Sequence, residues 1–371
     1  MHQRDYSSFL QGLQRFEKAM NGLPDRVPLC AQLHEFAMNE IGTTAREFYT
    51  TPEILTSATL AIQAKYGIDV PVLDYDVYNI EAEAIGQTIK FSDIAMPDVD
   101  RSQPLIRDRD DLSKIRTPDF ESDGRLMQVI EMNKLFRSLI GGEADTTIQF
   151  CAPFSLAANI RGIERLIMDI YADPNFARDL FDRITEELLA PWIVRLKTEF
   201  PLAQSICGSD AIASLPIVNI EILKKWIVPY IERLRDLCGP QVYVPNWVGE
   251  SLLDNPQEML DLKGQVCPGF VEGQDPDVEK LGPKFYKKYA EENGLPLILG
   301  IGAAFLATAT PAQVTQRVQR YIDVGGKNGR FALYLCNLGA TTPADNVRAA
   351  VAAVQRYGTY NDGPSRNELS E

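Results

Sequence analysis

The chain has 371 residues, of which 45% are hydrophobic and 24% charged, a globular composition sufficient for one large domain or two small ones. Its net charge of −14, with no basic stripe, argues against nucleic acid and anionic membranes as partners. No apolar run reaches the ~18 residues of a membrane-spanning helix, residues 1–14 do not resemble a signal peptide, and the scattered cysteines predict reduced thiols in a cytoplasmic protein.

Apolar strand-like runs alternate with amphipathic helical patterns along most of the chain. The expected strands are residues 27–34, 69–76, 146–152, 202–209, 241–247, 265–272, 295–300 and 331–337. The expected helices are residues 52–66, 126–140, 156–169, 174–199, 220–237, 278–292, 311–324 and 344–357. Thr51 before Pro52 is typical of a helix start.

Eight strands, each followed by helix, predict a single (β/α)₈ TIM barrel over residues 1–360, with N-terminal helices before the first strand. Residues 80–92 predict a small hairpin insertion. The acidic segment 361–371 predicts a disordered tail.

A barrel of this kind carries its chemistry at the carboxyl ends of its strands. Acid, amide and thiol groups gather there in this sequence, and cations are scarce. The candidates are His34, Glu35, Asp74, Tyr75, Asp76, Cys151, Phe154, Ser209, Asp210, Asn246, Trp247, Glu272, Gln274, Cys336 and Asn337.

Four of these candidates are expected to be catalytic: His34, Asp74, Asp76 and Glu272. His34 is the only histidine besides His2, and it would serve as a general acid or a metal ligand. Alternation along the strand predicts Asp74 and Asp76 on one face, with Tyr75 opposite. Capping of the following turn is the alternative role for the two aspartates. Crowded carboxylates raise one another's pKa, which would leave one protonated near neutrality.

Further candidates are assigned to binding. Substrate contacts are expected from Phe154, Asp210, Asn246, Trp247 and Asn337, although a helix cap at Asp210 and loop packing at Asn246 and Trp247 are alternatives. Cys336 and His34 are the candidate metal ligands, and a small buried apolar role is the alternative for Cys336. Arg161 is expected to form a salt bridge with Asp169 or Asp173.

Five segments in chain order resemble the uroporphyrinogen decarboxylase superfamily, over nearly the whole chain. They are Asp74-Tyr75-Asp76 with residues 83–86, residues 152–157, Arg161-Gly162 with Asp173-Pro174, residues 208–211, and Cys336 through Thr342-Pro343 to Asn346. The superfamily includes haem-pathway decarboxylases and methyltransferases that act with corrinoid proteins. The resemblance therefore implies a barrel and one of these activities.

Departures from the superfamily patterns narrow the activity. The porphyrin decarboxylases carry arginines in the segment matching residues 33–36, which here has none, so porphyrinogen decarboxylation is not expected. The thiol-methylating members hold zinc with a His-x-Cys pair and a later cysteine. Cys336 is in step with that cysteine, but Asn246-Trp247-Val248 replaces the pair. Zinc held by Cys336 and His34 would require further ligands from the carboxylates.

The demethylating branch is what the resemblance then implies. Such an enzyme moves a methyl group between a small methylated compound and a corrinoid (cobalamin) carried by a partner protein, and it must activate the leaving group. Members of the superfamily are often dimers, which implies a homodimer. A decarboxylase or lyase acting on a small carboxylic acid is one alternative, with Arg161 as its only candidate clamp. A non-catalytic small-molecule-binding relative is the other.

Overall fold

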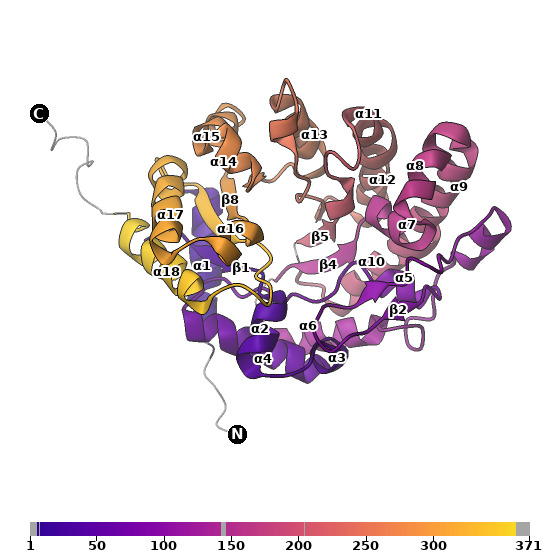
Figure 1. The fold of residues 1–371 in the computed structure, drawn as a ribbon, viewed down its shortest axis with the longest axis horizontal. Coiled ribbons are helices and arrows are strands. Elements are labelled where there is room, and N and C mark those ends of the chain that lie inside the picture. Colours follow the sequence, from indigo (N-terminus) through magenta and orange to yellow (C-terminus); the bar gives the residue numbers. More distant parts are fainter. Residues whose placement is uncertain (1–5, 7, 142–145, 204, 361–371) are drawn as a thin grey trace, which may run out of the picture.

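The computed structural model describes residues 6, 8–141, 146–203 and 205–360. It is an α/β fold in which two parallel sheets lie inside an outer ring of helices (Figure 1). One sheet has the order β1-β9-β8-β7 and the other the order β4-β5-β6. Their strands are β1 (Leu29–Ala31), β4 (Ile148–Cys151), β5 (Ile206–Ser209), β6 (Val242–Tyr243), β7 (Val271–Gln274), β8 (Leu297–Ile301) and β9 (Phe331–Leu335).

The helices follow the strands and cover their outer faces. They are α1 (Ser8–Asn21), α2 (His34–Ile41), α3 (Ala45–Thr50), α4 (Pro52–Tyr66), α5 (Ile80–Ala84), α6 (Leu126–Ile140), α7 (Pro153–Arg161), α8 (Ile163–Ala172), α9 (Pro174–Arg183), α10 (Ala190–Glu199), α11 (Ile220–Ile222), α12 (Val228–Cys238), α13 (Gln257–Val266), α14 (Asp277–Leu281), α15 (Pro283–Glu292), α16 (Ala303–Thr308), α17 (Pro311–Gly325) and α18 (Ala344–Tyr357). The expected bounds of α4, α6 and α18 are confirmed residue by residue.

Local sequence signals explain where several helices begin and end. Pro52 opens α4, and Gly67 closes it with a φ of 73°, a left-handed conformation that glycine adopts without strain. Thr310 and Gln313 form a reciprocal capping box at the start of α17. The helix expected over residues 156–169 is instead two helices, because Gly162 at φ 87° separates α7 from α8.

Three other expectations required correction. Residues 80–84 form helix α5, and the hairpin follows as β2 (Ile89–Lys90) paired antiparallel with β3 (Asp98–Val99). Residues 265 and 266 end helix α13, so the sixth strand begins later, at Val271. The second expected strand, residues 69–76, forms only an isolated parallel bridge from Val70 to Cys30. The expected disordered tail lies outside the described residues.

Side chains, not ladders of backbone bonds, join the two sheets. At one junction Gln149 donates from Nε2 to the Leu73 carbonyl (2.9 Å), and the Tyr75 hydroxyl donates to the Gln149 carbonyl (2.8 Å). At the other, Lys263 of α13 donates from Nζ to the carbonyls of Trp247 (3.0 Å) and Glu272 (2.7 Å). Both junctions therefore satisfy backbone carbonyls that a neighbouring strand would otherwise pair.

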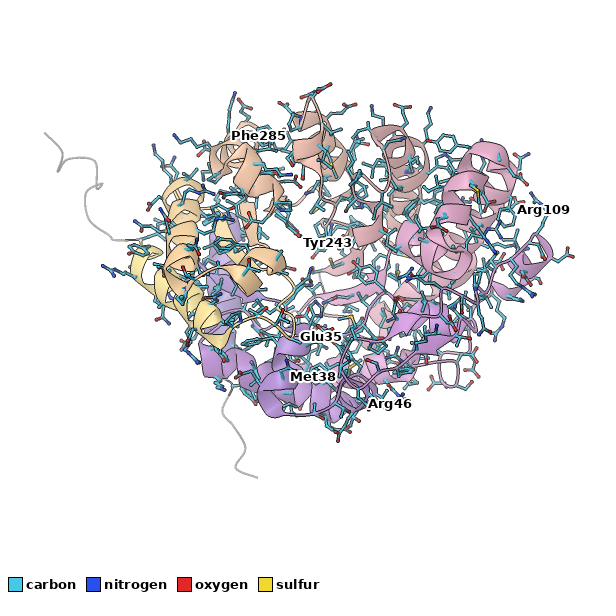
Figure 2. The ribbon with its side chains drawn as sticks, in the orientation of Figure 1. Glu35, Met38, Arg46, Arg109, Tyr243 and Phe285 are labelled. Carbon is cyan, nitrogen blue, oxygen red and sulfur yellow. The ribbon has the colours of Figure 1, made fainter. Side chains whose placement is uncertain are left out.

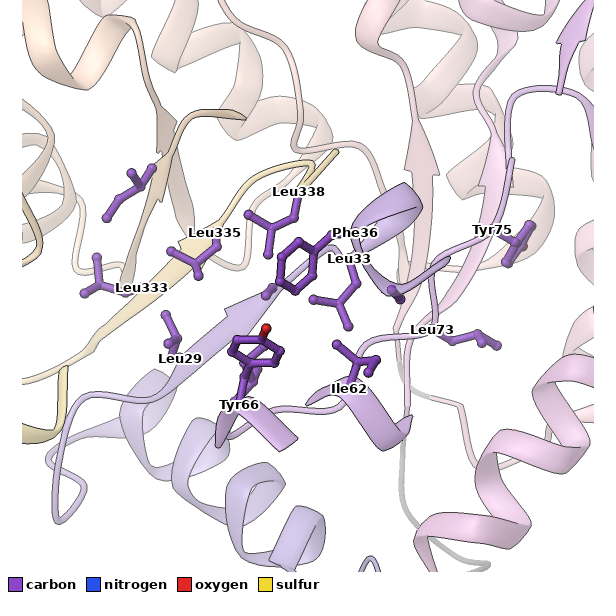
Figure 3. Close-up of a cluster of buried hydrophobic side chains, with 14 of the residues drawn as sticks. Leu29, Leu33, Phe36, Ile62, Tyr66, Leu73, Tyr75, Leu333, Leu335 and Leu338 are labelled. Atoms are coloured by element: carbon purple, nitrogen blue, oxygen red, sulfur yellow. The ribbon is translucent and has the colours of Figure 1, made fainter. Parts of the chain in front are cut away.

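The hydrophobic core lies between the strands and the surrounding helices. Leu29 and Leu333 of neighbouring strands belong to the same buried cluster as Ile62 and Tyr66 of α4 (Figure 3). The ring of Tyr66 meets that of Phe36 edge to face, with 5.3 Å between centroids. A second cluster surrounds β4, β5 and β6. Within the described ranges, no helix is long and apolar enough to span a membrane.

Candidate functional site

A cavity of about 990 Å³ lies between the two parallel sheets. The interior of a (β/α)₈ barrel is normally filled by layers of bulky side chains. Here the inward-facing residues are mostly small, polar or aromatic, and they leave a hollow. Its walls include Cys30, Gln32, His34, Glu35, Tyr75, Tyr78, Gln149, Cys207, Ser209, Tyr243, Asn246, Glu272, Gln274, Asp275, Tyr334, Cys336 and Asn337.

Strand alternation decides which residues reach this cavity. In β7, Glu272 and Gln274 face the cavity and are half-buried, whereas Val271 and Gly273 are buried on the outer face. A Cβ atom on Gly273 would lie 2.7 Å from the ring of Tyr286. The helix packing therefore holds the register that turns Glu272 inward.

The mouth of the cavity carries two residues in strained backbone conformations. His34, three residues after β1, has φ 38°, and Asn337, two residues after β9, has φ 47°. Their side chains meet, with 3.0 Å between Nε2 of His34 and Oδ1 of Asn337. Left-handed backbone in such residues costs about 1–3 kcal/mol and concentrates at functional sites. The strained pair therefore supports a candidate site at the mouth; the strand-end pattern indicated both residues, but not their backbone strain or their mutual bond.

Asp74 lies behind this pair. Its Oδ2 accepts a hydrogen bond from the backbone N–H of Leu33 (3.0 Å), and burial raises its pKa while the charge of His34 opposes this rise. Among the described residues, nothing bonds to Oδ1 of Asp74 or to Nδ1 of His34, although both atoms are buried. Two buried polar atoms without partners, on residues that interact electrostatically, are consistent with a site that completes its bonds with a ligand.

Glu272 of β7 lines the cavity. Burial raises the pKa of its carboxyl, while Lys263 and a hydrogen bond from Nε2 of Gln274 lower it. Four cysteines line the same cavity, and burial is the main cause that raises the pKa of each, in the case of Cys207 to about 12, with the charge of Glu272 adding to the rise. The other three are Cys30, Cys267 and Cys336. These thiols stay protonated, which argues against a thiolate nucleophile.

The two predicted metal ligands do not make a metal site. In the ranges that the structure describes, no group of three or more His, Cys, Asp or Glu side chains is arranged to hold a metal ion. A catalytic zinc site uses three protein ligands, with thiolate rather than thiol from cysteine. Cys336 and His34 by themselves therefore supply too few ligands to fit zinc.

Several predicted residues lie behind the cavity wall. Asp76 is buried and accepts two hydrogen bonds from Arg125, from Nη1 (2.9 Å) and Nη2 (2.7 Å). Asp210 accepts from the backbone N–H of Ser155 (2.9 Å) and from Nε1 of Trp247 (3.2 Å), and burial raises its pKa to about 6.

Phe154 is likewise fully buried, stacked on Phe181 with 6.1 Å between centroids. Neither it nor Asp74, Asp76, Asp210 or Trp247 lines the cavity, so their direct roles toward a substrate stay predictions.

Other predicted residues do reach the cavity surface. Asn246 accepts from the backbone N–H of Asp210 (3.0 Å) and lies 3.3 Å from the Tyr78 hydroxyl. Glu35 accepts from the backbone N–H of Met96 (3.0 Å). Glu35 and Tyr243 flank the central opening in Figure 2, whereas Arg109 lies at the periphery. Tyr75 also lines the cavity whereas Asp74 and Asp76 do not, so Tyr75 lies on the face opposite the two aspartates, as the alternation predicted, but its face is the one turned to the cavity.

Sequence reasoning missed the polar residues in the middle of the strands. Gln32, Gln149, Cys207, Tyr243 and Tyr334 all line the cavity. Their signal is visible in the alternation of strands such as β5, where Cys207 and Ser209 alternate with buried Ile206 and Gly208. Polar residues at every second position of a strand covered by helices indicate a polar interior.

The cavity walls that the structure describes contain no lysine or arginine. Arg161 forms the expected ion pair with Asp169 (2.7 Å) away from the cavity, which confirms that prediction. Asp275 lines the cavity but is held by Arg317 (2.7 Å). A wall of carboxyl, amide, hydroxyl and aromatic groups favours a neutral or cationic ligand over an anion.

Comparison with known proteins agrees with the resemblance seen in the motifs. The family model described as uroporphyrinogen decarboxylase (URO-D) matches residues 12–357. The chain belongs to the URO-D family. This confirms the family that the five sequence segments indicated.

One curated relative is a methylated-thiol–coenzyme M methyltransferase from Methanosarcina mazei. It is 23% identical over 304 residues, which cover 80% of this chain and 76% of the relative. The solved structure of a methyltransferase from Methanosarcina mazei aligns with a TM-score of 0.75 and 19% identity, covering 93% of this chain and 98% of that one. The structural likeness shows a shared fold.

Proposed function

We propose that this URO-D family member is a methyltransferase that moves a methyl group from a small methylated compound to a reduced corrinoid carried by a partner protein. Distant homology to a methyltransferase supports the reaction class. The observation that carries the proposal is a large cavity whose described walls contain no lysine or arginine and include a protonatable carboxyl, Glu272. Such a site suits an uncharged or cationic donor and disfavours a polycarboxylate.

The fold that positions this site is inferred to be a (β/α)₈ barrel. Residues 69–76 would supply the strand position between β1 and β4, and Lys263 would bridge β6 to β7. Side-chain bonds at both junctions support closure of the ring, although the backbone ladders are interrupted there. The carboxyl ends of the strands then form one mouth, where a flat macrocycle held by a partner could approach.

Glu272 is assigned the role of general acid. In the step, the bond between the methyl carbon and the donor heteroatom breaks, and a new bond forms to the electron pair of reduced cobalt. The heteroatom keeps the bonding electrons and takes the proton from Glu272, because an alkoxide or thiolate leaves poorly without one. The raised pKa of this buried carboxyl supports the protonated form that the step needs.

His34 and Asn337 are assigned to positioning at the mouth. Their mutual hydrogen bond holds two strained backbone segments together beside the opening. Asp74 lies behind His34 and interacts with its charge, so it would orient the imidazole. No step is assigned to zinc, since the donor set does not fit that metal.

The structure argues against one of the two alternative functions but not against the other. A decarboxylase or lyase of small carboxylic acids needs a cationic clamp, but Arg161 is occupied by Asp169 outside the cavity. A non-catalytic relative that binds a small molecule would have the same cavity without turnover. The experiment below separates it from an enzyme.

The test is methyl transfer to free cob(I)alamin, followed by absorbance, with a panel of methyl ethers, thioethers and methylamines as donors. We expect one donor class to be demethylated, and we expect Glu272→Gln to lower kcat by about 10²–10⁴, the usual contribution of a general acid. Exposed Glu164 on α8 provides the matched control, and Glu164→Gln should retain activity.

Two outcomes contradict this assignment in different ways. Full activity in Glu272→Gln would remove Glu272 from the mechanism but leave the methyltransferase reaction standing. Binding of a methylated compound with no methyl transfer to cobalamin would instead favour the non-catalytic relative.

A further inference from the structure

The cavity is not confined to the mouth. Its walls continue to the amino ends of the strands, where Thr147, Ser205 and Gln241 directly precede β4, β5 and β6 respectively. Phe270 directly precedes β7, and Phe16 of α1 also lines this part of the cavity. We call the part at the amino ends of the strands the lower end of the cavity, and its lining the lower wall. The hollow therefore runs the length of the strands, unlike a filled barrel interior.

The lower end is covered unevenly. Helix α1 lies against the start of residues 69–76, where Arg15 pairs with Asp69 (2.8 Å) and a Cβ on Gly12 would clash with the Asp69 carbonyl. On the other side of the lower end, residues that line the cavity are exposed to solvent. These exposed lining residues are Thr147, Pro240, Pro268 and Gly269.

The chemistry of the lower wall differs from that of the mouth. Hydroxyl groups form a chain from Thr147 to Ser205 (3.2 Å) and from Ser205 to Tyr243 (2.9 Å). Phe16 and Phe270 supply apolar surface. The described residues of this lower wall include no charged side chain, whereas the mouth has Glu35, His34 and Asp275. The lower end therefore suits small uncharged molecules with a hydroxyl or apolar character.

We propose that the lower end is a second entrance, through which small uncharged molecules reach Glu272 without passing the mouth. Under the proposed function, on which this role rests, the corrinoid of the partner occupies the mouth during methyl transfer. A donor or demethylated product could then pass between solvent and Glu272 through the lower end.

The reaction rates of the cavity thiols with a small reagent can measure how easily molecules enter from each end. Cys207 of β5 and Cys267, four residues before β7, lie toward the lower end, and Cys336 follows β9 at the mouth. Methylmercury chloride reacts with such thiols by replacing the thiol proton, which leaves as HCl when the sulfur–mercury bond forms. Labelling rates are followed by peptide mass mapping of the full-length protein.

Two bulky substitutions would close the two ends separately. Gly269→Trp places an indole at the lower rim, where a Cβ meets no atom within 4 Å and φ is not left-handed. Ala211→Trp does the same at an exposed position of the mouth. Gly269→Ala is the matched control for the backbone change.

We expect Gly269→Trp to slow labelling of Cys207 and Cys267 by about tenfold or more, equivalent to a barrier higher by about 1.4 kcal/mol, while Cys336 is unaffected. Ala211→Trp should slow labelling of Cys336 alone. If Gly269→Trp fails to fold by circular dichroism, Thr147→Trp replaces it at the same rim. The proposal is overturned if only Ala211→Trp slows labelling of all three cysteines. The assay needs no methyl donor or corrinoid, so its failure is distinct from failure of the proposed function.

Discussion

The two junctions between the sheets both supply hydrogen-bond donors to backbone carbonyls, but one uses a charged side chain and the other neutral side chains. Between β6 and β7, Lys263 donates to two backbone carbonyls and to Oε1 of Glu250 (2.9 Å), and both side chains are almost fully buried. Between residues 69–76 and β4, the neutral side chains of Gln149 and Tyr75 make the bonds. A charged junction holds its partners strongly but is fragile, because loss of one member leaves a buried charge.

The largest effect is expected from breaking the charged junction. Lys263→Met leaves Glu250 buried without its cation and two carbonyls without a donor, so the free energy of unfolding should fall by about 3–5 kcal/mol. Urea titration measures this. Lys288→Met, at a side chain that is 76% exposed, is the control and should change little.

A second substitution sharpens this result. Adding Glu250→Leu to Lys263→Met removes the unpaired carboxylate, so a large part of the lost stability should return. A double variant as unstable as the single one would show that the carbonyl bonds, and not the charge, hold this junction.

An intermediate effect is expected from Glu81, which lies behind β4 at the neutral side. Its Oε1 accepts from the Cys151 backbone N–H (3.1 Å), its Oε2 is buried without a described partner, and burial raises its pKa from 4.5 to about 8. A raised carboxyl pKa means that this group's stabilising contribution is complete below pH 4.5 and is lost as pH rises toward 8.

We therefore expect Glu81→Gln to gain stability relative to the natural protein between about pH 5 and pH 9, by about 2–4 kcal/mol. Urea unfolding at several pH values gives the comparison, with exposed Glu53→Gln as the control. A stability difference that does not change with pH would show that Glu81 does not hold its proton in the folded state.

The smallest effect is expected from breaking the neutral junction. Gln149→Leu leaves the Leu73 carbonyl without its donor, which should cost about 1–2 kcal/mol in urea unfolding. Tyr75→Phe removes the other bond and keeps the ring, so it serves as a matched variant with a similar or smaller cost. A loss as large as that of Lys263→Met would contradict the contrast between the two junctions.

Much of the fold was predictable because its signals are local. Pro52 with Gly67 and the periodic apolar residues between them were sufficient to define α4. The expected strand at residues 69–76 was less accurate, since its partners are side chains from elsewhere in the chain. The apolar pattern of a segment does not show how many backbone hydrogen bonds it will make with neighbouring strands.

The site was predictable in part. The strand ends pointed to His34, Asn246, Glu272, Cys336 and Asn337, all of which line the cavity, while their roles stay predictions. Asp76 has equally suitable chemistry, yet Arg125, 49 residues away in sequence, draws its carboxylate into a buried ion pair. Contacts of this range depend on how helices dock, which no local pattern encodes.

The sequence by itself determined the alternation of strands and helices, the family and the set of residues at the strand ends, because these follow from periodicity, caps and order along the chain. Only the tertiary structure decided that the interior is hollow and which of those residues line it. A shift of one residue in strand register exchanges the inward and outward faces, and close packing against Gly208 and Gly273 fixes that register. The hydrogen bond between strained His34 and Asn337 likewise exists only because β1 and β9, far apart in the chain, are neighbours in the sheet.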